Sequence, residues 1–538
     1  MYIYVDNNKI EIAENMTIEQ LCKNNVYENS KTAMMAVVNN SVVPLSTMLK
    51  DGDDTRVISI SETEGHRVYK RSLTFLFMKV VYELYPEAEV EVCHTINRGE
   101  LCKFRNIDME FVDVQEIKLR MFDLIKKDLK FRKIETAVEN VKNIESQQRR
   151  LELFETINKE MCTVYELDGY YDYVGGILLP STGYLNLFEL IELVGNGVLI
   201  LCPKKSNPSQ IEKYYFQPHL MATFDQVEKW AKIHNIHYLD DLNEKIIKND
   251  YAEMIQICEA LHEHCFSNIG EEIKKRGAKL VFVTGPSSSG KTTSANRTRI
   301  QLMVQGSNPL ILSMDDYFID RDKMIREPDG SLDFEHIRVV DLEEFKNQAI
   351  ALLNGEPVHL RRFDFKTGKG FYDNYTTSLQ DGSEIIIEGI HAFNPKVQNL
   401  FTDYVCYKIC VNPLSYINID DHNRISSTDC RKIRRMVRDM KHRGISAEKT
   451  IEMWPSIRKG EEENIFPYLE TADVILNTTL AYELSVLKKY AEKALSEVNR
   501  DSVNYIEAKR LMVLLSNVVS LDDETHIPMT SILQEFLK

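Results

Sequence analysis

The sequence predicts a multidomain protein of mixed α/β and α+β class, and three observations support that fold class. A chain of 538 residues is too long for one hydrophobic core, so about two to four domains are expected. Residues 280–297, LVFVTGPSSSGKTTSANR, combine an apolar strand, a glycine-bounded loop and the start of a helix. Residues 1–62 alternate like short strands around one helix, which predicts a small mixed β domain.

The composition indicates an acidic, cytoplasmic protein. A net charge of −16 argues against a broad phosphate-binding surface, although a local basic patch is compatible with it. The N-terminus lacks the basic and apolar regions of a secretory signal, and the longest apolar stretches are too short to cross a bilayer. We therefore expect no membrane contact, and we interpret the ten scattered cysteines as packing residues in a reducing compartment.

Residues 1–62 are expected to form the first domain, with a helix over 17–25 that Thr17 caps. The expected strands span residues 2–5, 9–13, 34–38, 42–45 and 56–60. This arrangement, with VVNNSVVPLSTMLKDGDD in its second half, resembles the TGS domain, the β-grasp module of threonyl-tRNA synthetases. A generic β-grasp domain that makes contacts within the protein stays open, because the composition does not choose between RNA and protein as a partner.

Residues 63–245 are expected to form an α+β domain. Its first elements are an amphipathic helix over 66–85 and a strand over 87–93, followed by long charged helices to about residue 158. The region resembles the second additional domain of threonyl- and alanyl-tRNA synthetases, whose editing site binds zinc through HxxxH and CxxxH pairs. The resemblance places no zinc ligand at the four corresponding positions: Arg71, Phe75, Val174 and Leu178. We therefore expect the scaffold without the deacylase chemistry.

Residues 246–275 are expected to form a helical linker, within a helical stretch from about residue 240. One cluster on it has the side chains of a metal site: Cys258, His262, His264 and Cys265. We favour packing over metal binding, because isolated His and Cys on an amphipathic helix are usually buried against a neighbour.

Within residues 276–480, the loop fits G-x-x-x-x-G-K-[ST] as Gly285, Gly290, Lys291 and Thr292. In such a loop backbone N–H groups surround nucleotide phosphates, and the dipole of the following helix favours negative charge. Lys291 is expected to reach the terminal phosphates, and Thr292 to ligate Mg²⁺. The expected ATP contacts are consecutive: Gly285, Pro286, Ser287, Ser288, Ser289, Gly290, Lys291, Thr292 and Thr293.

Two later strands end in carboxylates. The strand over 308–313 leads to Asp315 and Asp316, beside the phosphate crevice of an open sheet, where a kinase needs a base. The strand over 384–387 ends at Glu388, which can hold Mg²⁺ directly or through water. Either carboxylate alone could instead cap a turn.

A basic helix follows, CRKIRRMVRDMKHRG. Its arginines share part of one surface: Arg431, Arg434, Arg435 and Arg438, with Arg443 at the Gly444 end. Such a helix can close over a triphosphate and neutralise charge in the transition state. A solvated face or an RNA contact is the alternative.

Together these pieces resemble the uridine kinase and phosphoribulokinase branch of P-loop kinases, over about residues 279–479. The motifs are GPSSSGKTT, MDDYF, LDFEH, RRFDFKTGKG, IIIEGIHAF, RRMVRDMKHRG and ETADVILN. The resemblance implies that Asp315 is the base near a nucleoside 5′-hydroxyl, that Glu335 stands where an Asp binds the ribose, and that Glu388 is the metal-associated acid. The implied catalytic groups are Asp315, Lys291, Arg434, Arg438 and Arg443, and the implied acceptor contacts are Asp315, Tyr317, Glu335 and Phe363.

The departures from the family fall at base recognition. Phe363 and Gly368 occupy the positions of a Tyr and a His that help to read the pyrimidine. Phe363 can stack on a base but has no hydroxyl, and Gly368 has no side chain to donate a hydrogen bond. Ile445 also replaces the second lid arginine. The sequence therefore supports kinase activity better than it supports uridine specificity.

Residues 481–538 are expected to be helical and to pack against the kinase domain or a second subunit. The expected function is an ATP- and Mg²⁺-dependent kinase of the 5′-hydroxyl of uridine, cytidine or a related nucleoside. One alternative is a kinase of another small alcohol, such as a sugar phosphate or pantothenate. The other is a nucleotide-regulated tRNA- or RNA-binding protein, which the acidic composition opposes.

Overall fold

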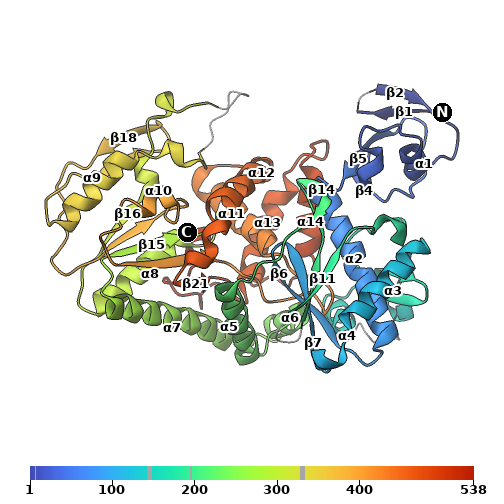
Figure 1. Cartoon of the computed structure of the whole chain (residues 1–538), viewed down its shortest axis with the longest axis horizontal. Helices are drawn as coiled ribbons and strands as arrows, with labels where there is room; N and C mark the ends of the chain where they lie inside the picture. Colours follow the sequence, from blue (N-terminus) through green and yellow to red (C-terminus); the bar gives the residue numbers. More distant parts are fainter. Residues whose placement is uncertain (7, 142–147, 194–196, 327–333, 538) are drawn as a thin grey trace.

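The computed structural model describes residues 1–6, 8–141, 148–193, 197–326 and 334–537. The molecule is elongated, with an N-terminal sheet at one end and a parallel sheet at the other (Figure 1). The last helices of the chain lie between these two ends, beside the middle region.

The N-terminal sheet contains five strands in the order β2-β1-β5-β3-β4, and in it β1 pairs with β5 in parallel. The strands are β1 Tyr2–Val5, β2 Asn8–Glu11, β3 Ala33–Val38, β4 Ser41–Val43 and β5 Asp54–Ser59. Helix α1 (Ile18–Lys23) begins as expected at Thr17, whose hydroxyl accepts from the Gln20 N–H, while the Gln20 side chain accepts from the Thr17 N–H.

The middle region is an α+β assembly. Its four-stranded sheet has the order β11-β12-β7-β6, and its three-stranded sheet the order β10-β9-β8. The strands are β6 Val90–Ile96, β7 Gly99–Phe104, β8 Arg132–Ala137, β9 Met161–Leu167, β10 Tyr170–Tyr173, β11 Glu189–Leu193 and β12 Gly197–Leu201, with a small ribbon of β13 Pro203–Lys204 and β14 Asn207–Ile211. The helices are α2 Thr63–Leu84, α3 Val114–Lys126 and α4 Gln148–Thr156.

The expected run of long helices up to residue 158 is wrong. Strands β7 and β8 interrupt it, because each finds a partner: β7 lies between β6 and β12, and β8 pairs along β9. These partners lie too far along the chain for helical periodicity to reveal them. Where the resemblance places the first zinc pair, the Arg71 guanidinium donates to the Ile177 carbonyl and the Phe75 ring packs edge-on against Phe131.

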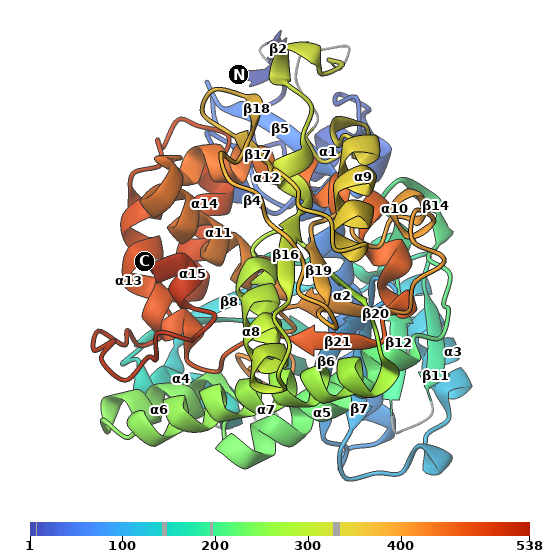
Figure 2. The same cartoon turned by 90° about the vertical axis from the view of Figure 1, so that its left-hand side faces the viewer.

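Three helices then run along one side of the molecule: α5 Pro218–His234, α6 Leu239–Ile247 and α7 Ala252–Arg276 (Figure 2). The helical stretch expected from residue 240 is therefore broken between α6 and α7. Helix α7 ends at Gly277, whose φ of +66° is a left-handed cap, and the chain enters the parallel sheet directly.

The parallel sheet has the order β16-β19-β15-β20-β21. Its strands are β15 Leu280–Thr284, β16 Leu310–Ser313, β19 Ile385–Glu388, β20 Cys406–Asn412 and β21 Val474–Asn477. Around it lie the hairpin β17 Arg361–Asp364 and β18 Lys369–Tyr372, and the helices α8 Lys291–Val304, α9 Leu342–Leu353, α10 Pro395–Gln398, α11 Ser427–Arg443 and α12 Ala447–Asn464. Parallel strands end at a common edge, so the loops after β15, β16 and β19 meet there.

The C-terminal helices are α13 Glu483–Ser496, α14 Tyr505–Leu515 and α15 Gln534–Leu537. They share one hydrophobic core with α7 and α11. The N-terminal sheet also reaches this region, since the Asn40 side chain donates to the Ser502 carbonyl at 2.9 Å. Among the described helices, none has both the length and the apolar surface needed to cross a membrane.

Candidate active site

The loop after β15 has the backbone of a phosphate cradle. Ser288 and Gly290 adopt left-handed conformations, with φ of +57° and +88°, and Gly290 caps α8. At Gly285 the requirement for glycine comes from space and not from backbone dihedrals, because its φ is not positive. A Cβ atom added there would lie 2.1 Å from the Val411 carbonyl oxygen, so this glycine allows β15 and β20 to pack closely.

The hydroxyls of the loop fit a bound phosphate. Ser288 and Ser289 are buried, and their Oγ atoms have no hydrogen-bond partner among the described residues. Buried polar groups without a partner are rare in folded proteins and favour a missing ligand. Lys291 Nζ donates to the Pro286 carbonyl at 3.2 Å, so the ammonium lies over the loop, and Thr292 is exposed beside it.

The structure distinguishes the two adjacent aspartates after β16. Asp316 is held by an ion pair with Arg362 at 2.9 Å and by the Phe363 N–H. Asp315 is exposed to solvent. Desolvation by the surrounding protein raises the pKa of Asp315 and the charge of Asp316 adds to this, while Lys291 opposes it. Asp315 is therefore the carboxylate with the environment of a base.

Glu388 ends β19, and its side chain is buried. Burial raises its pKa to about 7, with a further contribution from Asp315, while Lys291 opposes the shift. The Ser313 hydroxyl donates to it at 3.5 Å. A buried carboxylate beside the phosphate loop suits a metal ligand, because a cation would compensate its charge.

Glu335 joins the same group of charges, although it lies outside the strand ends. Burial raises its pKa to about 7, and Arg435 and Lys291 oppose the shift. Gly460 of α12 makes the approach possible, because a Cβ atom there would lie 2.5 Å from the Cβ of Glu335. Leu332 and Asp333 of the LDFEH motif lie outside the described residues.

The arginines of α11 have different roles. Arg434 is fully buried, where it pairs with Glu483 and donates to the Thr478 carbonyl at 2.7 Å. It cannot act as a mobile lid residue, since leaving these partners would leave a buried carboxylate unpaired. Arg431 and Arg435 contact the phosphate loop instead, by bonds to the Ser287 carbonyl and hydroxyl.

Asp439, which the sequence reasoning did not identify, organises the remaining arginines. Its buried carboxylate pairs with Arg435 at 3.0 Å, Arg438 at 2.9 Å and Arg443 at 3.5 Å. Glu461 of α12 was also missed. It pairs with Arg431 and accepts from the Ser287 N–H at 2.9 Å. No local pattern marks these acids, because their partners are set by the packing of α11 against α12 and the loop.

Two expected acceptor contacts lie in the core. Tyr317 is buried, and its hydroxyl donates to Gln348 at 2.9 Å, so the structure contradicts a direct role in acceptor binding. Phe363 is also buried and packs edge-on against Phe318 and Phe365. Gly368 closes the β17–β18 turn with a φ of +72°. Of this group Phe365 is the exposed ring.

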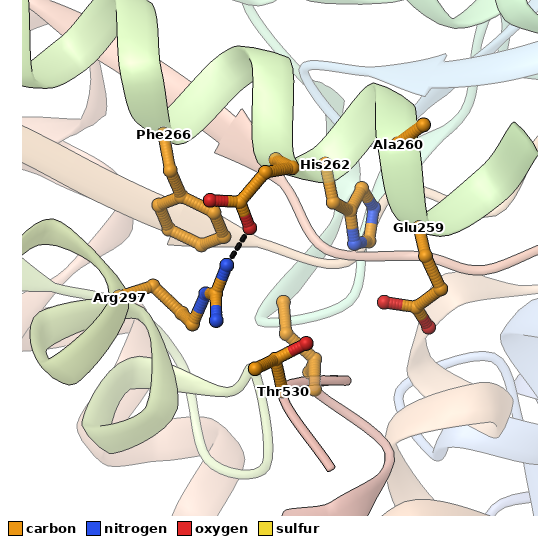
Figure 3. A pocket seen from close by; sticks show the side chains of 8 residues that line it. Glu259, Ala260, His262, Phe266, Arg297 and Thr530 are labelled. Carbon is orange, nitrogen blue, oxygen red and sulfur yellow. Dashed lines mark ion pairs between the residues drawn. The ribbon is translucent and has the colours of Figure 1, made fainter. Parts of the chain in front are cut away.

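A cavity of about 230 Å³ lies elsewhere, between α7, α8 and the segment near Thr530 (Figure 3). Arg297 of α8 pairs with Glu263 across it, and His262 lines the same space. None of the expected active-site residues lines this cavity. In the described part of the chain, no group of His, Cys, Asp and Glu side chains has the arrangement of a metal site, including the cluster around Cys258.

The two halves of the chain are similar to different known proteins. Residues 280–484 match the model of the phosphoribulokinase/uridine kinase family. A uridine kinase of Lactobacillus helveticus is 28% identical over 199 residues, which cover 37% of this chain and 85% of the relative. The N-terminal part matches threonine–tRNA ligases. The ligase of Pelobacter propionicus is 29% identical over 195 residues, which cover 35% of this chain and 30% of the ligase.

The chain therefore spans about 30% of the length of the ligases that it matches. A solved structure from Silicibacter sp. TM1040, provisionally assigned as a fructose transport system kinase, is 19% identical with a TM-score of 0.31. That match covers 39% of this chain and 98% of the other.

Proposed function

We propose that this chain, whose residues 280–484 are a domain of the phosphoribulokinase/uridine kinase family, is an ATP- and Mg²⁺-dependent kinase of the 5′-hydroxyl of uridine, cytidine or a related nucleoside. The observation that carries the proposal is the contrast between the paired aspartates. Arg362 holds Asp316, and Asp315 stays open beside Lys291 and the phosphate loop.

The residues of the site have different roles in phosphoryl transfer. Asp315 accepts the proton of the attacking hydroxyl, while Lys291 and the arginines that Asp439 aligns stabilise charge on the transferring group. Thr292 and Glu388 would hold Mg²⁺, which supplies further positive charge at the phosphates. The γ-phosphoryl group leaves ADP and bonds to the acceptor oxygen, whose proton passes to Asp315.

Glu335 and Phe365 are the groups that we expect to contact the acceptor. Glu335 lies close enough to Asp315 for their charges to interact, so one sugar could reach both carboxylates. With Phe363 packed in the core, the exposed Phe365 is a ring that could stack on a base. The similarity to a protein named uridine kinase favours a nucleoside, and another small alcohol is the rival.

For the other half, we propose that residues 1–62 are a TGS-like β-grasp domain and that residues 63–245 are a synthetase-like domain without editing chemistry. A helical linker over 246–275, the kinase domain over 276–480 and the helical segment 481–538 complete the chain, which we expect in the cytoplasm. The similarity to threonine–tRNA ligases favours one second candidate, in which this half binds tRNA and the phosphate loop acts as a switch.

The test is ADP release from Mg·ATP across nucleosides, pantothenate and sugar phosphates, with mass spectrometry of the product. Lys291→Ala serves as the blank, because loss of the ammonium group should lower the rate of ADP release at least about a hundredfold. Formation of a nucleoside 5′-monophosphate supports the proposal. Phosphorylation of a sugar phosphate or of pantothenate would show that the acceptor is not a nucleoside. If no acceptor supports ADP release and tRNA binding is sensitive to salt, the second candidate is favoured, in which the phosphate loop acts as a switch.

A further inference from the structure

The segment 528–537 packs against the phosphate loop from the far end of the sequence. Ile532, Leu533 and Phe536 are buried within it. A Cβ atom added at Gly290 would lie 2.9 Å from Ile532 Cγ2, so the segment and the loop are in direct contact. The lack of a side chain at Gly290 thus allows the left-handed turn and also leaves room for Ile532 of this segment.

The segment brings a carboxylate to the start of α8. Thr293 Oγ1 donates to Glu535 Oε2 at 2.8 Å, across 242 positions of sequence. Thr293 follows Thr292, the residue expected to ligate Mg²⁺. The charge of Glu535 also contributes to the raised pKa of Glu388 and acts on Arg443, so this carboxylate belongs to the same electrostatic group.

Helix α11 holds the segment in place. Lys441 Nζ donates to the Leu537 carbonyl at 2.6 Å, and the Arg434 guanidinium lies 5.3 Å from the centre of the Phe536 ring. The segment therefore connects the helix that carries the lid arginines with the helix that follows the phosphate loop. Glu535 makes the contact with α8, through Thr293.

Packing and the hydrogen bond from Thr293 do not by themselves require a carboxylate at Glu535. A neutral side chain could accept the same hydrogen bond from Thr293, whereas a carboxylate also brings a negative charge to the residue that follows Thr292. A negative charge at this place would attract a divalent cation held by Thr292. A bound cation thus gives the charge of Glu535 a purpose that packing does not.

We propose that Glu535 is a positioning residue of the nucleotide site, and that it strengthens the binding of Mg²⁺ by holding Thr293 and by adding negative charge beside the metal position. This inference rests on the proposed function of the site as a Mg·ATP site. It assigns part of that site to a segment outside the region that matches the kinase family, residues 280–484.

The test compares the full chain with its Glu535→Gln and Glu524→Gln variants by titration calorimetry with ATP at a series of Mg²⁺ concentrations, without acceptor. Glu524 is a matched control, because it lies in the same C-terminal region but accepts from Tyr490 and pairs with Lys489. In Glu535→Gln we expect the Mg²⁺ concentration for half-maximal binding to rise about tenfold, with metal-free ATP binding unchanged or tighter. Glu524→Gln should match the wild type.

Two results would overturn the inference. One is an unchanged Mg²⁺ dependence in Glu535→Gln. The other is an equal loss of metal-free and Mg²⁺-supported binding with a lower melting temperature, which would make the role purely structural. The proposed reaction can fail independently: Mg·ATP binding with the expected Glu535 effect, but no phosphorylated acceptor, would refute kinase activity and leave this inference standing.

Discussion

Two groups of buried charges, one at an interface of helix α11 and one in the active site, contain acids whose pKa values shift in opposite directions. The interface cluster joins α2, α11 and α14 and consists of Arg67, Asp429, Lys432, Glu507 and Arg510. Burial alone would raise the pKa of Glu507, but Arg510 and Lys432 hold it well below its ordinary value. In the active site, burial raises the pKa of Glu335 and of Glu388 to about 7, and Lys291 does not offset it.

The difference distinguishes a structural cluster from a binding site. In the interface cluster each carboxylate has cationic partners within the protein, with Arg510 2.6 Å from Asp429 and 2.7 Å from Glu507. In the active site the charge of Asp315 adds to the raised pKa values of Glu335 and Glu388. Protonation or a bound cation favours such carboxyl groups, and raised pKa values of this kind are frequent at functional sites.

The largest expected effect separates the two aspartates within the active site. Asp315→Asn should lower kcat by about 10² to 10⁴, since the hydroxyl then loses its base, while ATP affinity changes less than about threefold. Steady-state kinetics and nucleotide titration measure both. The control is Asp316→Asn, whose partner is Arg362. Equal losses of kcat in the two variants would remove the distinction that supports the mechanism.

The next effect compares the clusters by stability. Glu507→Gln leaves Lys432 without its carboxylate and Arg510 with Asp429 alone, which should cost about 3–5 kcal/mol of folding free energy. Glu388→Gln removes a repelling charge, so at pH 8 it should leave stability unchanged or increase it. Denaturant unfolding of both variants at this pH measures the contrast. A similar destabilisation in Glu388→Gln would mean that the active-site acids are structural after all.

The smallest effect is a dependence of stability on pH. The pKa values of Glu335 and Glu388 are raised to about 7 in the folded protein, so the stability that their protonated forms provide is lost as the pH rises from about 4.5 through 7. The melting temperature without nucleotide should be a few degrees lower at pH 8 than at pH 6. Mg·ATP should restore it.

The interface cluster should not contribute to this change. The pKa values of its acids are lowered, so their stabilisation persists above the ordinary carboxyl range and is lost only in acid. Thermal unfolding of Glu388→Gln across the same pH range is the control, and its dependence on pH should be weaker than that of the wild type. An equally steep dependence in that variant would assign the effect to other groups.

The parts of the site that the sequence predicted are those with a local signal. The loop follows β15, Lys291 comes at the end of the loop, and Glu388 ends β19, so strand and motif together indicated their place. Helical periodicity instead put Arg434 beside Arg438, because it shows which residues share a face but not which element covers it. Glu483 covers Arg434 from α13, and Tyr317 is buried against α9 for a similar reason.

The fold was predictable to a similar extent. The N-terminal strands and three strands of the parallel sheet, β15, β16 and β19, were expected near their observed ends, since alternation and apolar runs mark them, and the C-terminal segment was expected to be helical. Strands β7 and β8 were missed, and so was the role of Glu535. Each of these depends on a partner far away in the sequence, such as Thr293 for Glu535.

The contact between the two halves has a consequence for the synthesis of the chain. His422 bonds Asp172 of β10 at 2.7 Å through Nδ1 and Tyr82 of α2 at 3.1 Å through Nε2, and its side chain is buried. Asp172 leaves the ribosome 250 positions before His422, a delay of roughly 12–50 s at ordinary elongation rates. During that time Asp172 and Tyr82 lack the histidine that they bond in the folded protein. The N-terminal half can therefore complete its folding only when the loop before α11 has been made.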